Sequence, residues 1–115
     1  MPFLDPKVML HGRPLPGWSG RFFHSENNTF ALWDIAADAA PLHEHHHPEE
    51  EVWNVVEGEL LLTIDGDERP LGPGSGAIVP PGTPHSARVT TACRAVVVDH
   101  PVRRHLPGVP TPADG

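Results

Sequence analysis

The sequence has little material for disulfides or long helices. It contains one cysteine, Cys93, and no tyrosine. A single cysteine cannot form an internal disulfide, so Cys93 is expected to be a small buried apolar residue in a reducing compartment. Fifteen prolines and eleven glycines are spread over 115 residues, and apolar residues keep helical spacing for no more than about two turns. Long helices are therefore excluded, and strands joined by tight turns are expected.

Positive charge is also scarce. Eight basic residues stand against fifteen acidic ones, which gives a formal net charge of −7. Nucleic-acid-binding proteins neutralise phosphates with clustered Lys and Arg, so no DNA or RNA partner is expected. The first 25 residues contain several charged side chains and no continuous apolar segment. Neither a secretory signal nor a membrane span is therefore expected, and the expected location is the cytoplasm.

The length fits one domain with one core. We expect an irregular N-terminal arm over residues 1–17, a β domain over residues 18–102 and a Pro-rich tail over residues 103–115, with disorder over 107–115. Seven or eight short strands separated by Gly and Pro are typical of an antiparallel sandwich or barrel. The turn signals are Glu26-Asn27-Asn28, where asparagines tolerate a left-handed backbone, Asp65-Gly66-Asp67 and Pro80-Pro81-Gly82.

A dense group of histidines and glutamates lies within residues 43–51. In an extended strand, alternate side chains share a face about 7 Å apart, so His45 and His47 are expected to project together and His46 to the other side. Glu51 keeps the same parity after the turn at Pro48, whereas His46, Glu44 and Glu49 are expected to face solvent. Two histidines and a carboxylate on one face favour a metal site with open coordination positions over a solvated polar loop.

A further candidate ligand lies far along the chain. His85 opens a strand after the Pro80-Pro81-Gly82 turn, so an ion bound there would join distant parts of the β domain. A rival register for the first cluster, with His43, His45 and Glu50 as ligands, is also sterically possible.

These residues resemble the two conserved motifs of the cupin family. The first motif is His, one residue, His, three or four residues, Glu, six residues and Gly, and it is matched by His45, His47, Glu51 and Gly58. The second is Gly, five residues, Pro, one residue, Gly, two residues and His, matched by Gly74, Pro80, Gly82 and His85. The 15 residues between the motifs equal the short segment of small microbial cupins. Only the register with Glu51 keeps the spacing to Gly58, so it is preferred over its rival.

The resemblance implies an all-β cupin barrel, a jelly roll of the double-stranded antiparallel β-helix type, formed by one domain. It also implies one divalent metal ion held by His45, His47, Glu51 and His85. Three imidazoles and a carboxylate suit Fe, Mn, Ni, Co and Zn. His43 and Trp53 are candidate pocket residues, with Trp53 expected to point inward because it shares the parity of Glu51.

Several functions are compatible with such a barrel. The leading expectation is an O2-dependent dioxygenase that acts on a small diketone, catechol-like or flavonoid-like molecule. A non-redox isomerase, lyase or cyclase, in which the metal acts as a Lewis acid, is the second, and a non-catalytic small-molecule sensor is the third. His43 or Glu57 is the candidate general base. Unpaired strand edges and the N-terminal arm predict a homodimer, which light scattering would detect as twice the monomer mass.

Overall fold

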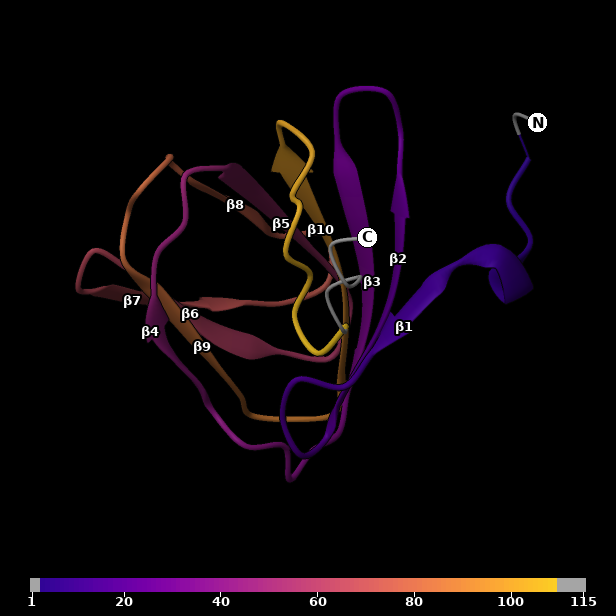
Figure 1. Ribbon diagram of the computed structural model, residues 1–115. Helices are drawn as coiled ribbons and strands as arrows, with labels where there is room; N and C mark the ends of the chain where they lie inside the picture. Colours follow the sequence, from indigo (N-terminus) through magenta and orange to yellow (C-terminus); the bar gives the residue numbers. More distant parts are fainter. Residues whose placement is uncertain (1–2, 110–115) are drawn as a thin grey trace.

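Almost all regular structure is β in the computed structural model, which describes residues 3–109 (Figure 1). A 3-10 turn, η1 (Pro6–Val8), precedes ten strands, whose bounds are β1 (Leu10–Gly12), β2 (Trp18–His24), β3 (Thr29–Ile35), β4 (Leu42–His45), β5 (Glu50–Glu57), β6 (Leu60–Ile64), β7 (Asp67–Leu71), β8 (Gly76–Val79), β9 (His85–Val89) and β10 (Cys93–His100). Within residues 3–109 no helix is long and apolar enough to cross a membrane.

The strands form two antiparallel sheets that face each other (Figure 1). The larger sheet has the order β1-β2-β3-β10-β5-β8, and the smaller one has the order β4-β9-β6-β7. Strands that are distant in sequence become neighbours, because β10 pairs with both β3 and β5. The expected all-β jelly roll is thus confirmed.

The tight turns follow the predicted positions, with one difference in mechanism. Between β6 and β7, Asp65 and Gly66 have φ of 49° and 81°, as a two-residue turn with positive φ at both positions requires. The hairpin of β2 and β3 is also formed, and the backbone N–H of Ser25 donates to the Asn28 carbonyl at 2.8 Å. Neither asparagine of this loop has a positive φ, so the expected left-handed conformation at Asn27 or Asn28 is wrong. The four-residue loop closes without it.

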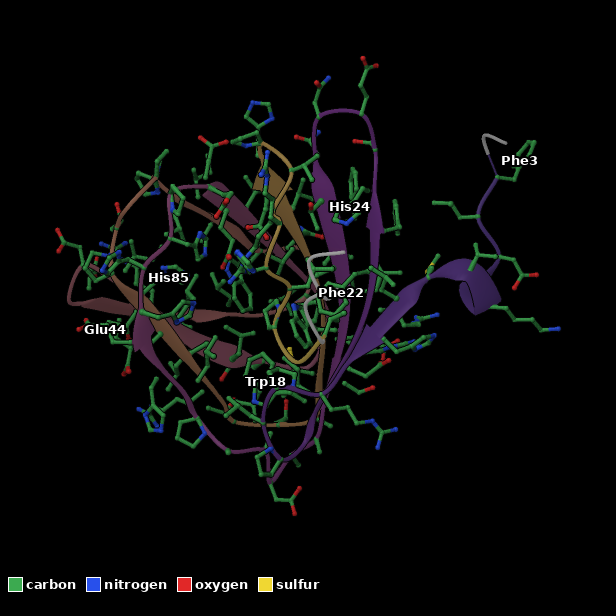
Figure 2. All side chains as sticks on the ribbon, viewed as in Figure 1. Phe3, Trp18, Phe22, His24, Glu44 and His85 are labelled. Carbon is green, nitrogen blue, oxygen red and sulfur yellow. The ribbon has the colours of Figure 1, made fainter. Side chains whose placement is uncertain are left out.

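The core lies between the sheets and is rich in aromatic side chains. Trp33 packs edge-to-face against Trp18 and Phe22, with ring centroids 5.5 Å and 5.3 Å apart. Figure 2 shows Trp18 and Phe22 directed into the interior, whereas Phe3 lies on the arm, away from the barrel. Cys93 is buried as expected. Inward-facing residues alternate with outward-facing ones along β2, β3 and β10, as the period of a strand requires.

Residues 3–17 and 101–109 make more regular contacts than their composition indicates. In the arm, β1 pairs with β2, with Leu10 opposite Phe22. At the other end, residues 101–109 fold back over the barrel, and Leu106 and Val109 pack against the core. The expectation of disorder is therefore wrong for residues 107–109, because Leu106 and Val109 pack against the apolar core of the barrel. Residues 110–115 of the predicted tail lie outside the described residues.

Candidate metal centre

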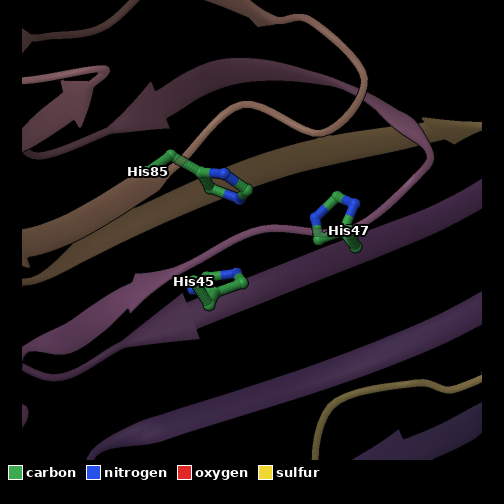
Figure 3. Close-up of side chains that lie close together, drawn as sticks. All are labelled: His45, His47 and His85. Atoms are coloured by element: carbon green, nitrogen blue, oxygen red, sulfur yellow. The ribbon is translucent and has the colours of Figure 1, made fainter.

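Three histidine rings from two chain segments meet inside the barrel (Figure 3). His45 ends β4, His47 follows in the next loop, and His85 begins β9. One ring nitrogen of each lies within 4.8 Å of those of the other two, and the ring centroids of His45 and His85 are 4.3 Å apart. The three candidate ligands predicted from the two motifs are therefore brought together.

Backbone pairing explains how the rings converge. His45 lies opposite His85 in the antiparallel pair of β4 and β9, and a bulge separates it from Leu42, which pairs with Ala87. Because a bulge inserts one extra residue, Leu42 and His45 both line the interior cavity although they are three residues apart. His47 lies beyond the strand, and its carbonyl accepts from the Gly82 N–H at 2.8 Å. The expected same-face placement of His45 and His47 thus arises from a bulge and a loop.

Hydrogen bonds to the backbone orient two of the rings. His45 Nδ1 lies 2.9 Å from the His43 carbonyl, and His85 Nδ1 lies 2.8 Å from the Thr83 carbonyl. A carbonyl can only accept, so Nδ1 carries a proton, and in the neutral imidazole Nε2 keeps a free lone pair. Such bonds to the outer nitrogen are typical of metal-ligating histidines. The Nε2 atom of His85 is buried and has no hydrogen-bond partner, which fits a site where a ligand completes its coordination.

Glu51 joins the cluster from the opposite sheet. Its side chain is 4% exposed and accepts from Trp53 Nε1 at 2.6 Å. Its other oxygen lies 2.9 Å from His47 Nε2, and His85 Nε2 is 3.4 Å from Oε1. Burial alone would raise the pKa of Glu51, but the interactions with His47 and His85 outweigh it and hold that pKa well below its ordinary value. Glu51 is therefore an ionised carboxylate, the form that binds a metal.

The pKa values of His45 and His85 are shifted in opposite directions. Burial lowers the pKa of His45, which favours the neutral imidazole needed for coordination. Burial would also lower the pKa of His85, but Glu51 and the Thr83 carbonyl raise it above its ordinary value. In the metal-free protein Glu51 therefore favours the cationic ring of His85, and an ion that binds there would replace the proton on Nε2.

Two residues of the site were missed by the sequence analysis. Asp99 lies directly opposite Glu51 in the pairing of β10 with β5 and is only 3% exposed. Arg103, the first residue of the predicted Pro-rich tail, places Nη1 3.6 Å from Asp99 Oδ2 and 3.7 Å from Glu51 Oε2. A signal for Asp99 was present, because it shares the parity of Ala95 and Val97, which are buried. No comparable signal exists for Arg103, whose position depends on how residues 101–109 fold back.

Asp99 has an unusual protonation equilibrium. Burial, followed by the nearby charge of Glu51, raises its pKa from 3.8 to about 7. One of its oxygens, Oδ1, is buried and has no hydrogen-bond partner. Asp99, His47 and Glu51 also have potential ligand atoms within 4.8 Å of one another. Asp99 can therefore exchange a proton near neutral pH beside the histidine cluster.

The raised pKa of Asp99 predicts that the metal-free protein loses stability as the pH rises. Between pH 3.8 and about 7, folded Asp99 holds a proton that the unfolded chain has released, so the free energy of unfolding falls with pH. Allowing for partial solvent screening, we expect Asp99→Asn to be about 2 kcal/mol more stable than the wild type at pH 8 and similar to it near pH 4. Urea unfolding at several pH values measures this difference.

Exposed Asp38 provides the control for this experiment. Asp38→Asn should follow the wild-type pH profile within about 0.5 kcal/mol, as surface substitutions usually do. A difference between Asp99→Asn and the wild type that stays constant from pH 4 to pH 8 would contradict the assignment.

A small cavity with apolar walls adjoins the cluster. It has a volume of about 40 Å³, enough for an ion and a few ligand atoms. Four aromatic side chains form part of its walls: Trp18, Phe22, Trp33 and Trp53. Its polar groups are His45, Glu51, Asp99 and Arg103. A larger open hollow of about 810 Å³ lies elsewhere, between residues 13–19 and the Arg94 region. It contains none of the histidines, and its Arg94 is already paired with Asp34 at 2.8 Å.

The remaining candidate residues, His43 and Glu57, lie outside the cluster. His43 is exposed, contributes its carbonyl to His45 and does not line the cavity beside the cluster, and the exposed Glu57 does not reach the cluster. Neither can act as the general base of this site. The rival ligand set of His43, His45 and Glu50 is therefore not supported, because the ring of His43 does not join the histidine cluster. His46 is exposed, as expected, and Figure 2 shows Glu44 pointing outward.

Glu49 and Trp53 both contact residues of the cluster, Glu49 through His47 and Trp53 through Glu51. Glu49 was expected to face solvent, but its side chain is only 15% exposed and lies 3.4 Å from His47 Nδ1. The expectation is wrong because the loop after Pro48 folds Glu49 back against the His47 ring. Trp53 points inward as predicted, is 2% exposed and lines the cavity.

Comparisons with known proteins agree with this architecture. The Cupin domain family matches residues 31–99. A stretch of 52 residues is 46% identical to the quercetin 2,3-dioxygenase of Bacillus subtilis (strain 168). That match covers 45% of this chain and only 15% of the length of the dioxygenase.

Solved structures resemble the fold over most of the chain. An RmlC-like cupin from Shewanella frigidimarina superposes with a TM-score of 0.79 at 22% identity, covering 90% of this chain and 93% of that one. KdgF from Halomonas sp. gives 0.79 at 20% identity, covering 90% and 96%. A variant of Bacillus subtilis oxalate decarboxylase gives 0.76 at 19% identity, covering 85% of this chain and 29% of that one. At these identities the likeness concerns the fold, and together with the family match it establishes that the chain belongs to the cupin family.

Proposed function

We propose that the chain is a mononuclear, divalent-metal-dependent enzyme that acts on a small organic molecule, with an O2-dependent dioxygenase as the leading reaction. The observation that carries the proposal is the convergence of three imidazoles and the ionised Glu51 in a buried position. The donors are nitrogen and oxygen, with no thiolate, which suits Fe, Mn, Ni, Co or Zn. When bound, such an ion would supply Lewis acidity and, if redox-active, a site for O2.

The oxygenase reaction is favoured by two observations. The 52-residue similarity is to a quercetin 2,3-dioxygenase, and the cavity walls are aromatic, as a flat unsaturated substrate would require. In this reaction the aromatic walls would contact the part of the substrate that enters the cavity of about 40 Å³ and would exclude water from it. Asp99 would accept a proton from a substrate hydroxyl at its unpartnered Oδ1, because its pKa of about 7 matches neutral conditions.

A second candidate, a non-redox isomerase, lyase or cyclase, is favoured by the pair of Asp99 and Arg103. A carboxylate that takes up a proton near neutral pH, beside a guanidinium 3.6 Å away, suits proton abstraction next to a carbonyl group. This chemistry needs the ion as a Lewis acid and does not need oxygen.

Oxygen consumption separates these reactions. Metal-free protein is reconstituted with Fe(II) under anaerobic conditions, and oxygen uptake is followed with catechol, acetylacetone and quercetin. We expect uptake with one of these substrates that requires both iron and His85, with His85→Ala as the inactive control. Turnover of the same molecules by Zn(II)-loaded protein without oxygen would instead support the second candidate. Ligand binding without turnover under either metal would contradict both and leave a sensor.

The homodimer stays a prediction. Two apolar side chains of the larger sheet, Val56 and Ile78, are 50% and 63% exposed, and strands β1 and β8 are its edges. Exposed apolar side chains and unpaired edges are features that a second copy would cover.

A further inference from the structure

Arg103 is held in the cavity by contacts that a solvated tail would lack. Its backbone N–H donates to Thr29 Oγ1 at 2.8 Å, and Thr29 is only 1% exposed. Its side chain is 17% exposed and lines the cavity together with His45 and Glu51. The next residue, Arg104, is exposed. Of the two adjacent arginines, only Arg103 therefore points toward the candidate metal centre.

The guanidinium is near two carboxylates without being fully engaged by them. Its Nη1 atom is 3.7 Å from Glu51 Oε2 and 3.6 Å from Asp99 Oδ2. Charge-assisted N–H···O bonds are about 2.7–2.9 Å long, so neither contact is a strong hydrogen bond. A planar guanidinium has several donors suited to a carboxylate, and this one retains donors for a ligand.

The charges around Arg103 favour an anion. Glu51 and Asp99 are the two carboxylates that line the cavity, and Arg103 balances one of them; Glu49 lies on the other side of the His47 ring and does not line the cavity. A divalent ion at the histidines would leave an excess of positive charge in the cavity, whose other walls are aromatic and aliphatic side chains. An unbalanced charge is costly in such surroundings, and a monoanionic ligand would neutralise it.

We propose that Arg103 binds the carboxylate of the substrate, and that the substrate class is small carboxylic acids with a short apolar or aromatic body. This inference rests on the proposed function and narrows its substrate panel. The cavity of about 40 Å³ admits only a few atoms, so a short acid fits it best, and a longer one would need the cavity to widen while Arg103 stays in place. The apolar part of the acid then contacts the aromatic walls, and its carboxylate lies between the guanidinium and the metal centre.

Isothermal calorimetry on Zn(II)-loaded protein tests the inference without requiring turnover. Two matched probe pairs are used, acetate with acetamide and benzoate with benzamide, because each amide keeps the shape of its acid without the charge. We expect both carboxylates to bind more tightly than their amides. Arg103→Gln should weaken carboxylate binding about tenfold to a hundredfold and leave amide binding within about threefold. Arg103→Lys, which keeps the charge, should recover part of the loss.

Arg104→Gln is the matched control, since it removes the same charge one residue away at an exposed position. It should leave the affinity for all four probes within about twofold. Metal content is measured for every variant, and Arg103→Gln should retain zinc because Arg103 is not among the candidate ligands.

The outcomes separate this inference from the function on which it rests. Wild-type protein that does not retain zinc would overturn the proposed function and the inference with it. Retained zinc, with no preference for carboxylates or with a preference that survives in Arg103→Gln, would overturn the inference alone. An equal loss in Arg103→Gln and Arg104→Gln would also overturn it, since general charge rather than the cavity position would then be responsible.

Discussion

Replacing His85 by alanine is expected to abolish retention of a divalent metal, and His47→Ala should have a similar effect. His85 is 1% exposed, and its Nδ1 faces the Thr83 carbonyl, so its Nε2 faces the cluster. The loss of a residue that only supports a metal ligand already lowers metal affinity about 10- to 100-fold. The loss of a ligand should therefore cost roughly a hundredfold or more.

Metal-to-protein ratios after gel filtration, together with competition against a chelator, measure this effect. His46→Ala is the matched control, because His46 lies between the two motif histidines but is exposed; it should bind metal as the wild type does. Added Zn(II) should also raise the melting temperature of the wild type and His46→Ala, since a ligand that binds only the folded state stabilises it. Equal metal loss in all three variants, or unchanged metal content in His85→Ala, would contradict the assigned ligand set.

Gly58→Ala should be among the most destabilising single substitutions in the chain. Gly58 connects β5 to β6 with φ of 75°, and a Cβ there would overlap the carbonyl oxygen of Ala92. The left-handed backbone costs a non-glycine residue about 1–2 kcal/mol. Because the overlapping atom belongs to the backbone, it cannot rotate away, and overpacking adds about 1–3 kcal/mol. We expect a total loss of about 4 kcal/mol, measured by urea unfolding of the metal-free protein.

Gly66→Ala separates the two contributions. Gly66 has a similar φ of 81°, but nothing lies within 4 Å of the position of its Cβ. This variant should lose only the backbone term, about 1–2 kcal/mol. Similar losses in the two variants would show that the close approach of Gly58 to Ala92 is unimportant. The comparison gives a physical reason for the glycine that ends the first cupin motif.

The local features of the fold follow from short stretches of the chain. The Asp65-Gly66 turn depends on two adjacent residues that tolerate positive φ, and the spacing from His45 to Glu51 is a property of one segment. Alternation of apolar residues placed Trp53 inside. Such features depend on backbone preferences and strand parity, which neighbouring residues determine. The jelly roll and the convergence of the four motif residues were predicted through the resemblance to the cupin motifs, because local features alone indicate only an antiparallel sandwich or barrel.

The remaining features depend on contacts between residues that are far apart in the chain. The bulge in β4 appears only when that strand pairs with β9, and the position of Asp99 beside the cluster requires the pairing of β10 with β5. Arg103 reaches the cavity because residues 101–109 return over the barrel and the backbone N–H of Arg103 donates to Thr29 Oγ1. The sequence alone determined the candidate ligands and the strand pattern. Only the tertiary structure decided which charged groups surround those ligands, because sheet register and the packing of the chain end are properties of the whole fold.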